Sequence, residues 1–577
     1  MTRRTDGKAA AKTNPALRMI VALAITSAAF LASRIAFLDA DLPGWWMSQL
    51  QPIDELYYTI PAFNLYHYGS MAHRVVSFVP TDGAPLNLLQ NLLTWPMLVV
   101  FGNNYYGLRM GSVVAGLGSM LFLYFCLRRH TQVHGDAPSV WLTDALPALW
   151  MAYLVCDFAF VAATRVAEPT IFEVLALTAI LFVASAWPVT DSNAATRAAV
   201  LGFMAVAAWL FVYVYNAFIV PAVLLAVLIE ASRGGLREVV LRAAAAIAGA
   251  IAAIALYAVV VYLAYGQSLL DLYHDTVQPL SGRVQSSALE SWYVIFTTNL
   301  FRFDLPLLVV FALAVPVFAY RVYRERDMYG VLVGSLLIFL MLQTGFAPTY
   351  WYRKLLIAGP LVILVVSMAI PYAGRFAAAI RIRRQAAATT LAYLALVVAG
   401  ISFLYLRVQY DWDPMFKRVT QACIVLLVLC VAGAVVAGEK HGPRLIAASF
   451  AAVIIPGLFM SFANVYRHPA FRYRDAMVAA APQLDGRVTV GEVSFAMRLY
   501  NTSEPVVNIY QYVYRPAGRE QYNALLDRIV SSGAASYSVS SAGGFPPVTG
   551  VTAEEVATYS VQAPFSPALS IYHLTAK

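Results

Sequence analysis

Apolar blocks of about twenty residues recur along this chain, separated by short connections that are polar or basic. An α-helix of that length rises about 30 Å, which matches the hydrocarbon thickness of a lipid bilayer. Of the 577 residues, 60% are hydrophobic and only 12% are charged, so an ordinary water-soluble fold is excluded. The pattern predicts a polytopic α-helical membrane protein.

Hydropathy predicts about 13 transmembrane helices. Most basic residues fall in alternate loops between them, so the net charge of +9 is a topology signal and does not indicate nucleic-acid binding. The N-terminus is then cytoplasmic. The four cysteines lack metal-ligand spacing, so we expect neither a metal site nor a disulfide framework. The predicted spans are 17–38, 107–127, 140–157, 169–187, 197–214, 217–231, 240–264, 304–320, 329–345, 355–373, 387–406, 419–437 and 443–463.

An odd number of spans places the large polar segments outside the cytoplasm. Residues 1–463 form the predicted transmembrane domain, in which 39–106 is the first outer loop and 265–303 is the second. Within the first loop, Leu86–Phe101 is apolar and is predicted to lie as an interfacial helix on the outer leaflet. Residues 464–577 are predicted to form a small periplasmic α/β domain. Strand-like alternation occurs there in GRVTVGEV, PVVNIYQYVY, AASYSVSS and ALSIYHLTA, and REQYNALLDRIVSS is a helical stretch. That domain lacks a phosphate-binding glycine loop, and packing or acceptor docking is its expected role.

Acidic residues are scarce, so the Asp54-Glu55 pair in QPIDELYYTIPAFNLYHYG is informative. The segment is amphipathic and follows the first span closely. Acidic residues that follow a proline are also common in the first turn of a helix. The pair after Pro52 can therefore be explained either by helix stabilisation or by a catalytic role.

Two further clusters lie on the predicted outer side. Arg165 and Glu168, in TRVAEPTIFEVLAL, are either a mutual ion pair or part of a site. Tyr350, Tyr352, Arg353 and Lys354 suit an aromatic belt at the interface as well as a ligand site. Positive charge is otherwise rare on this side, so its cations call for an anionic partner. These cations are Arg109, Arg165, Arg283, Arg302, Arg353 and Lys354.

The order of these motifs resembles the GT-C glycosyltransferases that use polyprenyl-phosphate sugars, namely the protein O-mannosyltransferase-like and aminoarabinose transferase-like enzymes. The Asp-Glu pair is followed by APLNLLQNLL, where that family has a PPLYYWLL-like interfacial helix. FGNNYYGLRMGS is similar to its FG-x-N-x-x-x-x-R-x-x-S stretch. TRVAEPTIFEVLAL and YWYRKLLIAGPLVIL resemble its Arg-x-x-x-Asp and Arg-Tyr-x-x-x-x-x-Pro segments.

The resemblance implies an inverting transfer of a sugar from a polyprenyl-phosphate donor. Asp54 is then the candidate base, and Glu55 and Glu168 would orient the base or the acceptor. The cations of the outer side would bind the phosphate of the leaving group. Tyr57, Tyr58, Tyr350 and Tyr352 would flank the sugar or the first isoprene units. No cofactor or metal is required, although a divalent metal is compatible with this chemistry.

The chain also departs from the family. Gly83 stands where the aminoarabinose branch has Lys, Ala84 replaces the first Pro of a pair, and Glu168 replaces Asp. Asp39-Ala40-Asp41 resembles a metal-binding DxD motif, but its position favours an interfacial turn.

The expected location is the inner membrane, with membrane lipids as surroundings and a lipid, glycan or protein hydroxyl as acceptor. The alternatives are a transporter or flippase of lipid-linked sugars and an O-antigen ligase or polymerase type of enzyme. Against transport, the rare charges lie near helix ends and not at the midplane, where only Asp157 and Asn216 hint at a site.

Overall fold

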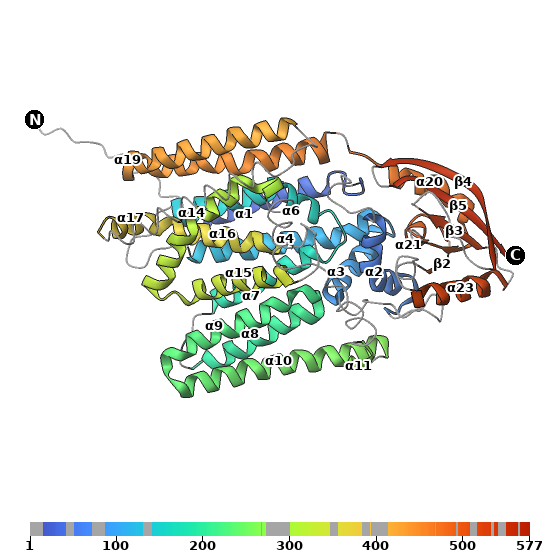
Figure 1. Ribbon diagram of the computed structural model, residues 1–577, viewed down its shortest axis with the longest axis horizontal. Coiled ribbons are helices and arrows are strands. Elements are labelled where there is room, and N and C mark those ends of the chain that lie inside the picture. Colours follow the sequence, from blue (N-terminus) through green and yellow to red (C-terminus); the bar gives the residue numbers. More distant parts are fainter. Residues whose placement is uncertain are drawn as a thin grey trace, which may run out of the picture.

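The computed structural model consists of a long bundle of helices followed by a domain that contains a β-sheet (Figure 1). The sheet lies beyond one end of the bundle, which we call the domain end. The structure describes residues 15–41, 51–71, 87–130, 141–187, 190, 192–266, 268–272, 301–346, 356–382, 393, 414–467, 469–491, 494–502, 504–507, 516–531, 536–540, 550–563 and 566–576.

The main helices coincide with the predicted spans. Within the described part of the chain, seven helices are long and apolar enough to cross a membrane, and further apolar helices are shorter. The predicted span 387–406 lies almost wholly outside the described residues, so the total of 13 remains a prediction. The main helices are α1 (Pro15–Ile35), α4 (Tyr105–His130), α5 (Leu146–Cys156), α7 (Thr170–Ala186), α8 (Ala194–Ala207), α9 (Ile219–Ala231), α10 (Leu236–Tyr265), α14 (Phe301–Glu325), α15 (Met328–Phe346), α16 (Ala358–Ala369) and α19 (Pro414–Ser461).

Shorter helices extend or connect these elements. Two of them, α2 (Gln51–Tyr68) and α3 (Leu88–Phe101), lie in the segment 39–106 that was predicted as the first outer loop, at the amphipathic segment and the apolar helix expected there. The others are η2 (Trp141–Ala145), α6 (Phe158–Ala163), η3 (Ala208–Val212), η4 (Val214–Phe218), η5 (Ser232–Gly234), α11 (Leu269–Leu272), η9 (Ile370–Tyr372), α17 (Ala373–Ile382) and η10 (Phe462–Tyr466).

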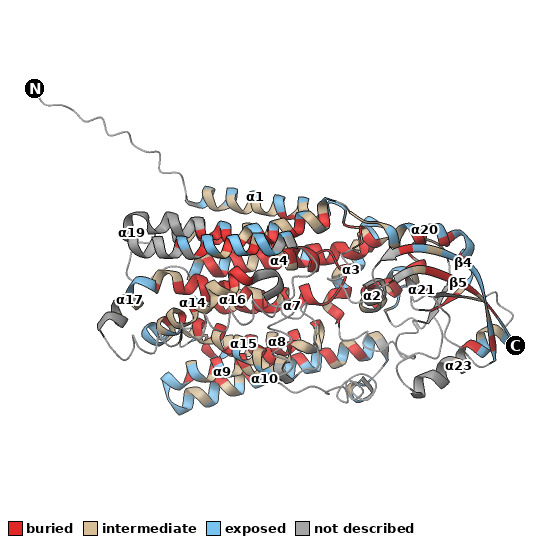
Figure 2. Ribbon diagram, turned by 45° about the horizontal axis from the view of Figure 1, so that its top comes forward, coloured by how far each residue is buried: buried red, intermediate tan, exposed pale blue. Residues whose placement is uncertain are grey.

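Burial separates the central helices from those at the periphery (Figure 2). Every residue of α16 except Gly359 is buried, and α4 and α7 are buried over most of their length. In contrast, α10 exposes large apolar side chains such as Ile251 and Leu263. A surface of that composition is stable in lipid and not in water.

The element α19 covers two predicted spans, 419–437 and 443–463. Cys423, Leu427 and Ala452 belong to one hydrophobic cluster. A straight helix would separate the first and the last of them by about 40 Å. The two halves of α19 therefore lie side by side, as the orange ribbons in Figure 1 show.

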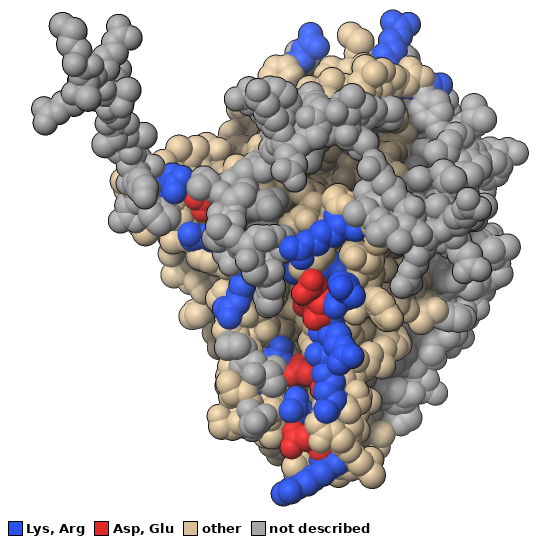
Figure 3. Space-filling model, turned by 90° about the vertical axis from the view of Figure 1, so that its left-hand side faces the viewer, with Lys and Arg blue, Asp and Glu red and all other residues tan. Residues whose placement is uncertain are grey.

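Positive charge gathers at the end of the bundle opposite the sheet, which we call the basic end (Figure 3). Arg321 donates to the carbonyls of His130 and Met368, and Arg233 donates to that of Arg326. These contacts join the ends of α4, α9, α14 and α16 at one face. The predicted cytoplasmic loops that the structure describes thus meet at the same end.

The C-terminal domain holds a five-stranded sheet in the order β2-β1-β3-β5-β4. β1 pairs in parallel with β2 and β3, whereas β5 pairs antiparallel with β3 and β4. The α/β character is as predicted. Its elements are α20 (Arg472–Leu484), β1 (Val488–Val490), α21 (Ser494–Met497), β2 (Glu504–Val507), α23 (Pro516–Ser531), β3 (Ser536–Ser540), β4 (Val551–Ala563) and β5 (Ser566–Ala576).

The sheet and the first outer loop share a hydrophobic core. Phe63 of α2 and Leu108 of α4 belong to the same buried cluster as Met477 of α20 and Ile571 of β5. The C-terminal domain therefore covers the helices that carry the predicted acidic pair.

Candidate functional site

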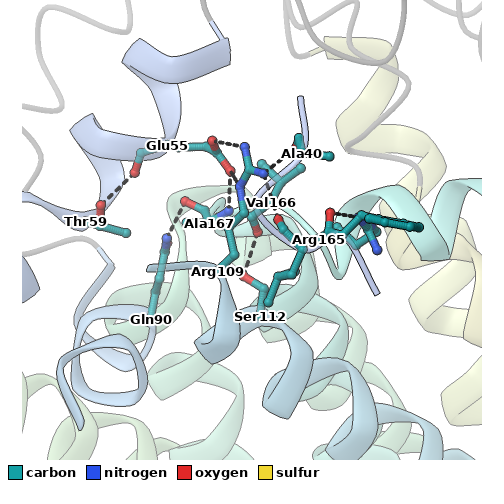
Figure 4. Close-up of polar contacts among 11 residues, drawn as sticks. Ala40, Glu55, Thr59, Gln90, Arg109, Ser112, Arg165, Val166 and Ala167 are labelled. Carbon is teal, nitrogen blue, oxygen red and sulfur yellow. Dashed lines mark hydrogen bonds and ion pairs between the residues drawn. The ribbon is translucent and has the colours of Figure 1, made fainter. Parts of the chain in front are cut away.

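Glu55 lies in the first turns of α2, and its side chain is completely buried. Both of its carboxylate oxygens accept hydrogen bonds from Arg109 at 2.8 Å (Figure 4). Oε1 also accepts the main-chain N–H of Ala167 at 3.0 Å. A planar guanidinium and a carboxylate form this two-bonded geometry readily, and it fixes both groups.

Arg109 uses its remaining donors on the main chain. Its Nη1 donates to the carbonyls of Leu38 and Ala40, at 2.9 and 2.6 Å. The guanidinium also lies over the ring of Tyr105, 4.8 Å from its centroid. A lipid phosphate was the expected partner of Arg109, but the structure gives it Glu55 and two carbonyls instead. In the structure, Arg109 therefore links α2 to the segment that follows α1.

The loop between α6 and α7 is held at the same point. Gln90 of α3 donates to the carbonyl of Ala167 at 2.8 Å, and Ser112 of α4 donates to that of Val166 at 2.6 Å. Glu168, the next residue, is buried. The structure thus brings together Glu55, Arg109 and the Arg165–Glu168 segment, which are far apart in sequence.

Arg165 is buried and points to the C-terminal end of α1. It donates to the carbonyls of Ser33, Arg34, Ala36 and Phe37. Burial lowers the pKa of Arg165 to about 10, so the group still carries its charge at neutral pH. We expected Arg165 to pair with Glu168 or with a phosphate, but in the structure its guanidinium donates to these four carbonyls. Carbonyls at the end of a helix are available for such contacts because they have no helical partners.

Arg34 is a buried residue that the sequence reasoning missed. It donates to the carbonyls of Leu154 and Val155, both at 2.9 Å, and to the hydroxyl of Thr164 at 2.8 Å. The sequence feature that could have identified it is an arginine in the last turn of an apolar helix, where a positive charge interacts favourably with the helix dipole.

The Asp39-Ala40-Asp41 segment fastens the C-terminal domain to the bundle. Asp39 accepts from Arg474 at 2.7 Å, and Asp41 accepts the main-chain N–H of Tyr473 at 2.9 Å. Asp41 and Ala470 also form an isolated β-bridge. We call these contacts the clasp. The turn expected for this segment is therefore also a docking element.

Tyr58 points from α2 toward the bundle. Its hydroxyl lies 3.2 Å from that of Tyr213, and the two rings meet edge to face with centroids 5.9 Å apart. Tyr213 has an extended backbone between η3 and η4, so it interrupts an apolar helix at this point. The sequence did not single out Tyr213.

Other predicted residues are placed only in part. Asp54 and Tyr57 lie in the first two turns of α2, and Arg302 lies at the start of α14, by their backbones. Arg283, Tyr350, Tyr352, Arg353 and Lys354 lie outside the described residues. Within the residues that the structure describes, no group of three or more His, Cys, Asp or Glu side chains could hold a metal ion.

Comparison with known proteins identifies the fold. No protein-family model matches the chain, and no curated protein matches it in sequence. The crystal structure of ArnT from Cupriavidus metallidurans bound to undecaprenyl phosphate superimposes with a TM-score of 0.53 and 14% identity, over 96% of this chain and 97% of that one. The apo structure of the same protein gives 0.51 and 14%, with the same coverage. The chain thus has the fold of these structures, which confirms the predicted GT-C fold class.

Proposed function

We propose that this protein is an integral-membrane glycosyltransferase that moves a sugar from a polyprenyl-phosphate donor to a hydroxyl of a cell-envelope acceptor. The observation that carries this proposal is the ArnT fold over nearly the whole chain, one example of which binds undecaprenyl phosphate. The burial of Glu55 against Arg109, directly after Asp54, supports a site at the start of α2.

The proposed chemistry is a direct displacement at the anomeric carbon. Asp54 takes the proton from the acceptor hydroxyl as its oxygen bonds to that carbon, and the bond from carbon to phosphate oxygen breaks. One base and one face of attack invert the configuration. Glu55 is the positioning residue, because its contacts with Arg109 and Ala167 fix the turn of α2 that also carries Asp54.

The leaving group is a lipid phosphate, and cations stabilise the charge that it gains. Since Arg109 and Arg165 are occupied by protein groups, we assign this task to Arg353 and Lys354, with Arg283 and Arg302 as further candidates. The chemistry needs no metal, because cations of the chain can neutralise the phosphate. Tyr58 is proposed to line the sugar side of the site.

The proposed location is the inner membrane, with the N-terminus in the cytoplasm and the domain end in the periplasm. The acceptor class is a lipid, a glycan or a protein. A transporter is not favoured, because the Glu55–Arg109 pair lies at the domain end beneath the sheet and not on a broken helix at the midplane.

The test is mass spectrometry of envelope lipids and glycans from cells with the intact chain, a deletion, Asp54→Asn or Glu554→Gln. Glu554 lies exposed on β4 and serves as the control. We expect the deletion and Asp54→Asn to lose one sugar mass and Glu554→Gln to keep it. Unchanged glycans in the deletion would contradict the proposal, and a loss in the deletion alone would exclude Asp54 as the base.

A further inference from the structure

A cavity opens at the basic end, between the C-terminal turns of α4 and α7. Its volume is about 290 Å³. This end is the one farthest from the proposed active site, and Figure 3 looks onto it. The residues that line the cavity are Phe125, Arg128, Arg129, Phe182, Ser185 and Ala186.

One wall of the cavity is aromatic. The ring centroids of Phe125 and Phe182 are 6.0 Å apart, and Phe182 stacks on Phe122 at 5.2 Å. Phe125 remains 39% exposed although its helix is central to the bundle. An open aromatic wall on a membrane helix is suited to an acyl chain.

Arg128 and Arg129 line the other side of the cavity. Arg129 is exposed, and its Nη1 donates a long hydrogen bond of 3.4 Å to the carbonyl of Ala186. Among the described contacts of Arg128, Nη1 donates to the sulfur of Met19, and Nη2 lies 3.8 Å from a carboxylate oxygen of Asp144, which is longer than a hydrogen bond. Each guanidinium has five N–H donors, so these contacts leave donors for an anion.

We propose that this cavity binds an anionic phospholipid of the leaflet at the basic end. The phosphate would accept hydrogen bonds from Arg128 and Arg129, and the first part of an acyl chain would lie against Phe125 and Phe182. A free phosphate would use the arginines alone and leave the aromatic wall open. The two walls together therefore indicate a lipid, and this assignment does not depend on the proposed function.

The experiment measures binding of labelled dioleoylphosphatidylglycerol to the purified full-length protein in a neutral detergent. Dioleoylphosphatidylcholine and inorganic phosphate are the competitors. The variants are Arg128→Gln with Arg129→Gln, Arg129→Gln alone, and Ala186→Trp, which fills the cavity without changing its charge. The control is Arg237→Gln with Arg324→Gln, since both arginines are exposed at the same end and do not line the cavity.

Two arginines close to a lipid headgroup correspond to an affinity loss of about tenfold to thirtyfold when both are neutralised. We expect that loss in the double variant, a smaller one in Arg129→Gln, and a comparable one in Ala186→Trp. The control should bind as the unmodified protein does. An equal loss of affinity in the control would show that lipid binding depends only on the overall surface charge, which contradicts the proposal. Full binding by Ala186→Trp would show that the lipid does not bind in this cavity. Equal displacement by inorganic phosphate would show a phosphate site that needs no lipid.

Discussion

The buried arginines at the domain end donate hydrogen bonds mainly to main-chain carbonyls. Arg34, Arg109 and Arg165 each donate to carbonyls at or beyond the end of a helix. Such carbonyls have no helical partner, and in a dry environment each unsatisfied group costs roughly 1–3 kcal/mol. Arginine is suited to this task because it has several donors in one plane and keeps its charge when buried. Lysine has a single donor centre and could not reach the same set.

The Glu55–Arg109 pair can be tested with a double-mutant cycle. Glu55→Gln and Arg109→Gln should each destabilise the protein by about 3–5 kcal/mol, because each leaves a buried charge without its partner. The double variant should lose less than the sum of the two. The described free cysteines are buried or half-buried, so a thiol-reactive dye can report thermal unfolding in detergent. Strictly additive losses would show that the two residues do not act as a unit.

Arg353 is the cation that we expect to contact the donor phosphate. Arg353→Ala should raise KM for the polyprenyl-phosphate sugar by about tenfold to a hundredfold, since a charged hydrogen bond contributes roughly 1.5–3 kcal/mol. The measurement is steady-state transfer over a range of donor concentrations. Arg487→Ala, an exposed arginine of the C-terminal domain, is the matched control. Equal rates at every donor concentration would remove Arg353 from the phosphate site.

Helix packing within the bundle depends on close approach at glycine. A Cβ atom added to Gly249 of α10 would lie 1.9 Å from the carbonyl oxygen of Ala199 in α8. Small residues permit such contact between transmembrane helices, where tight packing takes the place of the hydrophobic effect. By contrast, a Cβ atom at Gly359 of α16 would meet nothing within 4 Å.

These two glycines form a matched pair of substitutions. Gly249→Ala should lower the thermal midpoint, because the backbones of α8 and α10 must separate. Gly359→Ala should leave it unchanged or raise it, since alanine favours a helix by about 1 kcal/mol over glycine. Both can be measured in detergent with the thiol-reactive dye. A gain in stability for Gly249→Ala would contradict the close contact of the two helices.

Helices were more predictable than strands for a physical reason. A transmembrane helix must be apolar over its whole length, so most spans and the amphipathic α2 could be predicted within a few residues. The strand β4 was missed because it lies at the sheet edge and is largely exposed, so its sequence VTAEEVATYSVQA lacks a clear alternation. The sequence singled out Glu55 and Arg109 separately, but it did not predict that they pair, since sequence spacing does not encode a contact between distant helices.

The clasp and the shared hydrophobic core connect the helix bundle to the C-terminal domain. Burial raises the pKa of Asp41, while the N–H of Tyr473 lowers it to a smaller degree. A raised pKa means that the protonated form is favoured in the folded state. The contribution of Asp41 to stability is therefore fully present below its ordinary pKa of 3.8 and is lost as the pH rises through the folded value.

The direction of this pH dependence of stability can be tested by comparing Asp41→Asn with the unmodified chain. The thermal midpoint of the unmodified chain should rise relative to that of Asp41→Asn when the pH falls from about 7.5 to about 4. Asp485 provides an opposite control. Hydrogen bonds from Thr502 lower its pKa, so the unmodified chain should lose stability relative to Asp485→Asn over the same change. An Asp41→Asn difference that does not vary with pH would contradict the assignment.

The shared core also sets an order of biosynthesis. Phe63 is synthesised early in translation, but its buried cluster includes Ile571 of β5, which follows it by about 500 residues. Asp41 likewise can form its contacts with Ala470 and Tyr473 only after those residues have been synthesised. The helices around the proposed site therefore reach their final packing only after the last strand has left the ribosome. A chain that stops before β5 would leave Phe63 and Leu108 without part of their buried cluster.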